Sequence, residues 1–150
     1  MNLSTGLFNN VLDGGIATAF TTPVMEIREG SPPADADTVT QGSLICSVDL
    51  PDTGYFAAAS GGIVALAGSW SGTSQINGTA GWFRIMNSAD TGVGSTTLPR
   101  IDGSISATDG AGDLWFDNTT IVVLDVITIT AFSVGLARGV FGGTASGSFS

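Results

Sequence analysis

The sequence predicts an all-β fold, a jelly-roll-like β-sandwich that begins with a short helix and ends in a Gly/Ser-rich arm. Two observations carry this prediction. Residues 126–134 alternate, with Ile127 and Ile129 on one face and threonines on the other, which is typical of a strand with one buried face. In addition, about eight short strand-like runs follow one another with turn residues between them, as in sandwiches and jelly rolls.

The first element is a short helix within residues 1–13. Apolar residues recur in it every four positions, at Leu3, Leu7 and Val11. Ser4 or Thr5 is expected to cap its start, and Gly14 is expected to end it. Residues 16–20 are expected to add one more turn.

The strands that follow are short, rich in β-branched or aromatic residues, and bounded by Gly, Pro, Asp or Ser. They are expected at 23–29, 43–50, 63–66, 79–86, 96–101, 103–107, 114–116, 121–123 and 126–134. In the strand 79–86, Trp82 and Arg84 point to one face, while Phe83 and Ile85 point to the other. We expect Phe83 and Ile85 to face the core together with Ile127 and Ile129.

Two stretches rich in small residues are expected to lie outside the regular strands. Residues 68–78 surround Trp70 with Gly, Ser and Thr, which predicts a loop that leaves Trp70 exposed. Trp82 and Trp115, by contrast, lie within strand patterns and are expected in the core. Residues 137–150 are almost entirely Gly, Ser, Ala and Thr, which predicts an arm that follows a single domain formed by residues 1–136.

The charge pattern limits the possible partners. The chain contains 13 acidic residues and four basic ones, which gives a net charge of -9. The basic residues are Arg28, Arg84, Arg100 and Arg138. We expect no nucleic acid partner, because phosphate binding depends on Lys and Arg, although a partner with a basic surface stays open. The apolar runs are too short for a membrane-spanning helix, and no signal peptide is expected.

Residue types also exclude most catalytic classes. The absence of His rules out a Ser-His-Asp triad and His metal ligands, and the absence of Lys rules out Schiff-base chemistry. Cys46 lies in an apolar run and is expected to be a buried small hydrophobe. We therefore expect no catalytic residue, no metal and no cofactor.

Two groups of carboxylates leave alternatives open. Asp109, Asp113 and Asp117 are spaced by four residues, and Asp35 and Asp37 by two. A calcium site built from loops is one alternative. A pair of carboxylates that hydrolyses glycans is another.

A resemblance to a known family rests on six segments: Met1–Leu7, Leu12–Gly14, Ile27–Asp37, Gly81–Arg84, Asp113–Asp117 and Ile127–Phe132. In these segments the chain resembles a family of small structural proteins of tailed bacteriophages, most closely the capsid decoration (cement) proteins. The sequence departs from the family in Leu124-Asp125, where a turn with Gly is expected, and in its Gly/Ser-rich end.

The resemblance implies a non-enzymatic virion protein that is made in the host cytoplasm and binds the outer surface of the head, which it stabilises. The implied partners are the major capsid protein and further copies of the chain, as a homotrimer. The absence of Lys points the same way, because edge strands without charged guards need neighbours to cover them.

The residues expected at a subunit or capsid interface are apolar and come from the helix, the predicted loop and the arm. They are Leu3, Leu7, Phe8, Trp70, Val140, Phe141 and Phe149. Two other functions stay open. An exposed Trp70 would favour a tail or fibre component that binds a receptor or glycan, and a cleft with two carboxylates would favour a glycan hydrolase.

Overall fold

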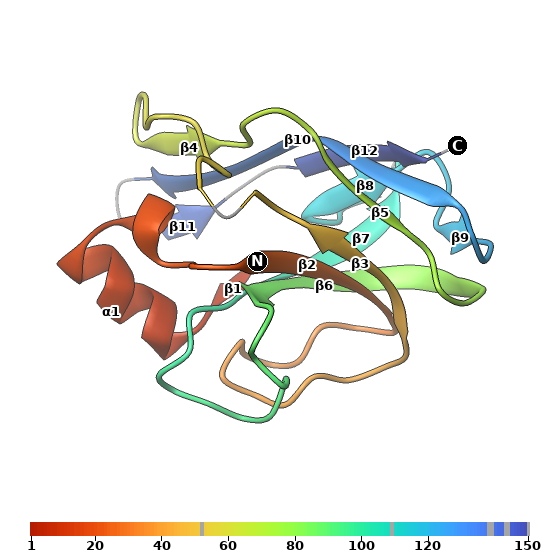
Figure 1. The fold of residues 1–150 in the computed structure, drawn as a ribbon, viewed down its shortest axis with the longest axis horizontal. Coiled ribbons are helices and arrows are strands. Elements are labelled where there is room, and N and C mark those ends of the chain that lie inside the picture. The colour runs from red at the N-terminus through yellow and green to blue at the C-terminus, as the bar shows by residue number, and fades with distance from the viewer. Residues whose placement is uncertain (52, 109, 138–139, 143–144, 150) are drawn as a thin grey trace.

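In the computed structural model, the chain forms one sheet that curls around a core, with a short helix at one end (Figure 1). The structure describes residues 1–51, 53–108, 110–137, 140–142 and 145–149. At Leu12, at Asp13 and from residue 136 onward, Gly147 excepted, it describes the backbone alone.

The elements confirm the predicted all-β class with a short N-terminal helix. The helical elements are α1 (Thr5–Asp13) and a 3-10 turn, η1 (Ile16–Thr18). The strands are β1 (Asn2–Leu3), β2 (Pro23–Glu29), β3 (Leu44–Asp49), β4 (Ile63–Ala65), β5 (Trp70–Thr73), β6 (Gly78–Asn87), β7 (Ile101–Ala107), β8 (Leu114–Phe116), β9 (Thr120–Ile121), β10 (Val126–Ala137), β11 (Val140–Gly142) and β12 (Ala145–Phe149).

The strands pair in the order β1-β7-β8-β12-β10-β5-β3-β2-β6-β9, and β6 also pairs with β7. This last pairing closes the sheet on itself. The two halves of the curled sheet therefore face each other across one core and are joined on both sides. Most neighbours are antiparallel, but β8 runs parallel to both β7 and β12.

The core contains the four residues that the alternating sequence pattern predicted to lie there. Phe83, Ile85, Ile127 and Ile129 are all fully buried, which confirms the prediction. The ring of Phe83 meets that of Phe132 edge-on, with 5.7 Å between centroids. On β7, a Cβ at Gly103 would overlap the Phe83 ring, so glycine allows this ring to lie against the neighbouring strand.

The expected positions of the tryptophans are partly wrong. Trp70 is not in an exposed loop but on β5, where it is 1% exposed and packs between Phe56 and Phe132. Trp115 is 36% exposed, because its neighbours on β8 take the two inward positions of that short strand. Trp82 is fully buried, but on the same face of β6 as Arg84 and outside the main hydrophobic cluster.

The two buried tryptophans are expected to differ in their response to phenylalanine. The Trp82 Nε1–H donates to the Glu29 carbonyl at 3.1 Å, whereas Trp70 Nε1 finds no partner among the described residues. Trp82→Phe would remove a donor from the Glu29 carbonyl, while Trp70→Phe removes a donor that has no partner among the described residues. We expect Trp82→Phe to lose at least ~1 kcal/mol more unfolding free energy than Trp70→Phe. Urea unfolding measures both, and equal losses would contradict this expectation.

Helix α1 begins as the sequence predicts. The Ser4 hydroxyl accepts a hydrogen bond from the Leu7 N–H at 3.1 Å and donates one to the Leu98 carbonyl at 2.7 Å. Gly14 ends the helix. Because α1 packs on the core through Leu7, which is fully buried, the prediction that Leu7 lies at an interface is wrong. Among the described residues, no helix is long and apolar enough to cross a membrane.

The Gly/Ser-rich end is not an arm in its described part. Strand β12 pairs with β10 on one side and with β8 on the other, within the same sheet. Gly147 is buried, and a Cβ there would overlap the ring of Phe116, so a small residue suits this strand. The structure describes the backbone of Val140, Phe141 and Phe149 but not their side chains, so the interface predicted for them stays a prediction.

Candidate functional site

Two long connections without helix or strand, residues 30–43 and 88–100, lie together outside the sheet, beside β6 (Figure 1). We call them the loop platform. Their backbones are joined directly, since the Thr40 N–H donates to the Gly92 carbonyl and the Ser95 N–H to the Asp37 carbonyl, both at 2.8 Å. Ala36, in the first of these loops, is fully buried. Backbone hydrogen bonds therefore join the two loops into one layer.

The first anchor of the loop platform is Arg84, on the face of β6 that points away from the core. Its guanidinium makes two hydrogen bonds of 2.7 Å to the carboxylate of Asp102 on β7. A third N–H donates to the Thr38 carbonyl at 3.0 Å. The side chains of Arg84 and Asp102 are both fully buried. Arg84 also lies over the ring of Trp82, 5.6 Å from its centroid.

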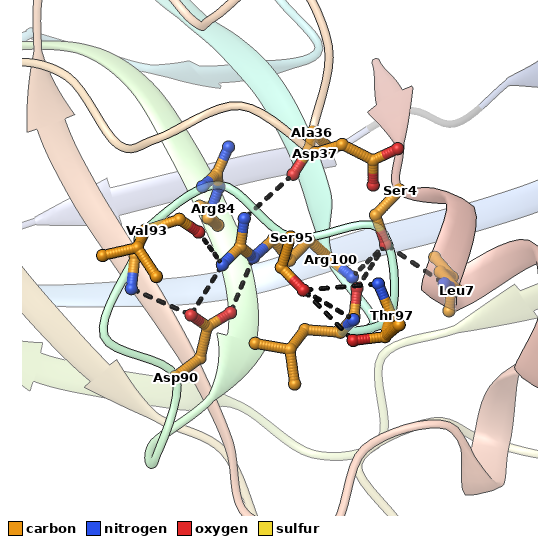
Figure 2. Close-up of polar contacts among 12 residues, drawn as sticks. Ser4, Leu7, Ala36, Asp37, Arg84, Asp90, Val93, Ser95, Thr97 and Arg100 are labelled. Carbon is orange, nitrogen blue, oxygen red and sulfur yellow. Dashed lines mark hydrogen bonds and ion pairs between the residues drawn. The ribbon is translucent and has the colours of Figure 1, made fainter.

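The second anchor is Arg100, which Figure 2 shows at the centre of a polar cluster. It binds the Asp90 carboxylate through two hydrogen bonds of 2.6 and 2.7 Å. Its remaining donors reach the Val93 carbonyl at 2.6 Å and the Ala36 carbonyl at 3.3 Å. One side chain therefore holds both loops, while its backbone N–H donates to the hydroxyl of Ser4 at the start of α1.

The two carboxylates differ in their electrostatics. Burial tends to raise the pKa of Asp90, but hydrogen bonds from Arg100 and from the Gly92 N–H outweigh it and hold the pKa below its ordinary value. Asp90 also keeps 8% exposure, whereas Asp102 keeps none. Burial is therefore the larger effect at Asp102 and raises its pKa, although Arg84 opposes the shift.

This cluster has the character of a structural anchor. Both carboxylates face a guanidinium, and both guanidinium groups bind loop carbonyls. Ions buried in this way recover their desolvation cost only when such pairing is complete, so the cluster is stable only while the loops stay in place. This role was not predicted from the sequence. The available signal was a charged residue, Arg84, inside the otherwise apolar strand 82–86.

The loop platform presents two apolar side chains at its surface. Val39 is 49% exposed and Val93 is 57% exposed. Two acids lie in the loop that carries Val39, and one of them binds within the loop while the other binds the start of α1. Asp35 accepts from the Asp37 N–H at 3.0 Å, and Asp37 accepts from the Thr5 N–H at 2.9 Å. This pair of carboxylates, noted from its spacing, therefore shapes the loop.

The other carboxylate group is also engaged in local contacts. Asp113 accepts from the N–H and hydroxyl of Ser104, both at 3.0 Å, and from the N-terminal ammonium at 2.9 Å. These contacts outweigh burial and lower its pKa. Asp117 accepts from the Thr108 hydroxyl at 3.3 Å, and Asp109 lies outside the described residues. Within the described residues, no three acidic or thiol groups are placed to hold a metal ion.

The seven residues expected at an interface do not share one surface. Leu7 and Trp70 belong to the core, Leu3 is half-buried, and Phe8 is exposed. The three from the C-terminal stretch have undescribed side chains. Cys46 is fully buried as expected, and burial, with a smaller contribution from Asp49, raises the pKa of its thiol to about 11.

Comparison of the chain with protein-family models, with curated proteins and with solved structures finds no match. The chain is an all-β protein with a short N-terminal helix and a platform of two anchored loops.

Proposed function

We propose that this protein is a non-enzymatic structural component of a tailed-phage virion. In this proposal it binds the outside of the capsid as a decoration protein that stabilises the head, and the loop platform is the face that docks. The observation that carries the proposal is the pair of buried arginines, which fix two irregular loops carrying exposed Val39 and Val93.

The two buried arginines favour a binding role, because buried ion pairs are costly to form and their main effect here is to fix the loops. A buried ion pair seldom stabilises a protein more than apolar residues of the same volume would. What the two arginines do provide is a fixed loop conformation, since each holds backbone carbonyls. A fixed conformation lowers the entropy lost on binding. Exposed valines on a rigid surface are suited to a partner of complementary shape.

The charge of the surface indicates the chemistry of that partner. Each arginine side chain that the structure describes is in an ion pair: Arg28 with Glu26, Arg84 with Asp102 and Arg100 with Asp90. The remaining surface charge of this part of the chain is acidic. A capsid face with Lys or Arg around an apolar patch would complement it and would speed association.

Two other functions were considered from the sequence, a tail component that binds a glycan or receptor and a glycan hydrolase. An exposed Trp70 would have favoured the tail component, but Trp70 is buried. A glycan hydrolase needs two carboxylates facing one cleft. The three described clefts are lined by a single carboxylate among them, that of Asp49.

The proposal predicts that a charge placed on the platform blocks docking. Val39→Asp and Val93→Asp are each expected to weaken binding to purified particles lacking the protein by at least tenfold, ~1.4 kcal/mol. A carboxylate buried in an apolar contact would be unpaired, but on the free protein it stays in water. The melting temperature should therefore stay within a degree or two of wild type, since exposed positions contribute little to stability.

Thr53→Asp is the matched control, because it adds the same charge at an exposed position outside the platform. It should bind particles like the wild type. Unchanged binding by both valine variants would overturn the platform assignment. Quantitative gels of purified particles distinguish head from tail, since a copy number near that of the major capsid protein means decoration and a handful of copies means tail.

A further inference from the structure

The turn between β9 and β10 has a side chain unsuited to its backbone. The Asp125 N–H donates to the Val122 carbonyl at 3.0 Å, which closes a four-residue turn. Its third residue, Leu124, has a φ of 74°, a conformation that favours glycine. Leu124 is also 75% exposed. Strained backbone and an exposed leucine each cost free energy in an isolated chain, and such strain is concentrated at functional sites.

Side chains from two segments hold this turn in place. The Asp125 carboxylate accepts from the Val122 N–H, and the Asn77 side-chain carbonyl accepts from the Val123 N–H, both at 2.8 Å. Exposed apolar side chains surround Leu124: Ile76, Val122, Val123 and Val126. We call residues 122–126 the apolar turn.

An apolar cleft of about 260 Å³ lies at the opposite end of the molecule. Helix α1, η1, β4, β10 and the connection before β4 line it with Val11, Gly15, Ile16, Ala59, Gly62, Val64, Val134 and Gly135. None of these lining residues is charged. An apolar cavity of about 150 Å³ holds a benzene ring, so this cleft has room for a leucine side chain.

The apolar turn and the cleft are connected by β10 but cannot meet within one molecule. The turn ends at Val126, where β10 begins, and the cleft is reached at Val134. Eight residues of extended strand separate these positions by about 26 Å. In Figure 1, β10 runs from the turn beside β9 to β4, near α1.

We propose that the apolar turn of one copy inserts Leu124 into the apolar cleft of a second copy. Each copy has a net charge of -9, so copies repel one another. The contact joins a cleft whose described lining residues are uncharged to a turn whose only charged residue, Asp125, is already hydrogen-bonded within the turn. The turn and the cleft are different surfaces, so the contact is head-to-tail, and it closes into a ring when the rotation between copies allows. Neither the apolar turn nor the cleft contains a residue of the loop platform.

Sedimentation velocity on the purified full-length chain tests this contact without any capsid. Wild type is expected to associate with rising concentration. Leu124→Gly is expected to weaken association at least tenfold while leaving the melting temperature equal or higher, because glycine relieves the positive φ. Ala59→Trp, a change at an exposed residue that lines the cleft, should weaken association equally.

Mixing the two variants gives the sharpest test. Leu124→Gly keeps an intact cleft and Ala59→Trp keeps an intact turn, so an equimolar mixture should form one-to-one dimers and nothing larger. Val93→Asp is the control and should associate like the wild type. A wild type that stays monomeric at the highest concentration, or a Leu124→Gly variant with unchanged association, overturns the inference. Particle binding by a monomeric chain would leave the proposed function intact.

Discussion

Replacing Arg100 with leucine is expected to lower the free energy of unfolding by about 3–5 kcal/mol. The change leaves Asp90 with its carboxylate buried and unpaired, and the carbonyls of Ala36 and Val93 lose their donors. This is a large share of the ~5–15 kcal/mol that holds a typical domain together. Among the described residues, no other cation lies within ion-pair distance of Asp90 to replace it.

Chemical denaturation of the purified variant measures this loss. Arg28→Leu is the comparison, because the side chains of Arg28 and Glu26 keep 15% and 13% exposure whereas those of Arg100 and Asp90 keep 0% and 1%, so a smaller loss is expected. The double variant Arg100→Leu with Asp90→Leu should recover much of the loss, since it removes both buried charges. Equal losses for Arg100→Leu and Arg28→Leu would show that the platform is not held by its buried arginine.

Phe83→Ala is expected to cost about 3–5 kcal/mol. Phe83 is fully buried, meets Phe132 edge-on, and lies against Gly103 on the neighbouring strand. Its removal leaves a cavity that the closed sheet cannot collapse to fill, because strands pair on both sides of β6. Thermal and urea unfolding measure the loss. Val93→Ala, at an exposed position, should stay within ~0.5 kcal/mol of wild type. An unchanged melting temperature for Phe83→Ala would contradict the burial of this ring.

Much of the sheet could be predicted because alternation is a strong local signal. The bounds of β2 match the expected strand 23–29, and the two faces of β6 and β10 were assigned correctly. The strands β5 and β12 were missed. They read Trp-Ser-Gly-Thr and Ala-Ser-Gly-Ser-Phe, which by composition resemble a loop and an arm. They are also the strands that bridge the two halves of the sheet, since β5 pairs with β3 and β10, and β12 with β8 and β10.

Small residues suit these bridging strands for a reason that is not local. At Gly72 and Gly147, a Cβ would overlap a neighbouring strand or ring, so the low apolar content reflects close approach in the folded state. The same limit applies to the loop platform. Arg84, Arg100, Asp90 and Asp102 are spread over 19 residues, and nothing in their spacing shows which carboxylate each arginine binds. The predicted interface failed at Leu7 and Trp70 because apolar character does not distinguish a core position from a docking position.

The placement of β12 has a consequence for synthesis. This strand leaves the ribosome after every other strand of the sheet, yet it lies between β8 and β10. Until it arrives, both neighbours have unpaired N–H and carbonyl groups along one edge, which invites pairing with other nascent chains. The contacts that complete the sheet also join residues far apart in sequence, and such topologies fold slowly. Translation that pauses before β12 therefore leaves β8 and β10 without their shared partner and exposes this sheet to misassembly.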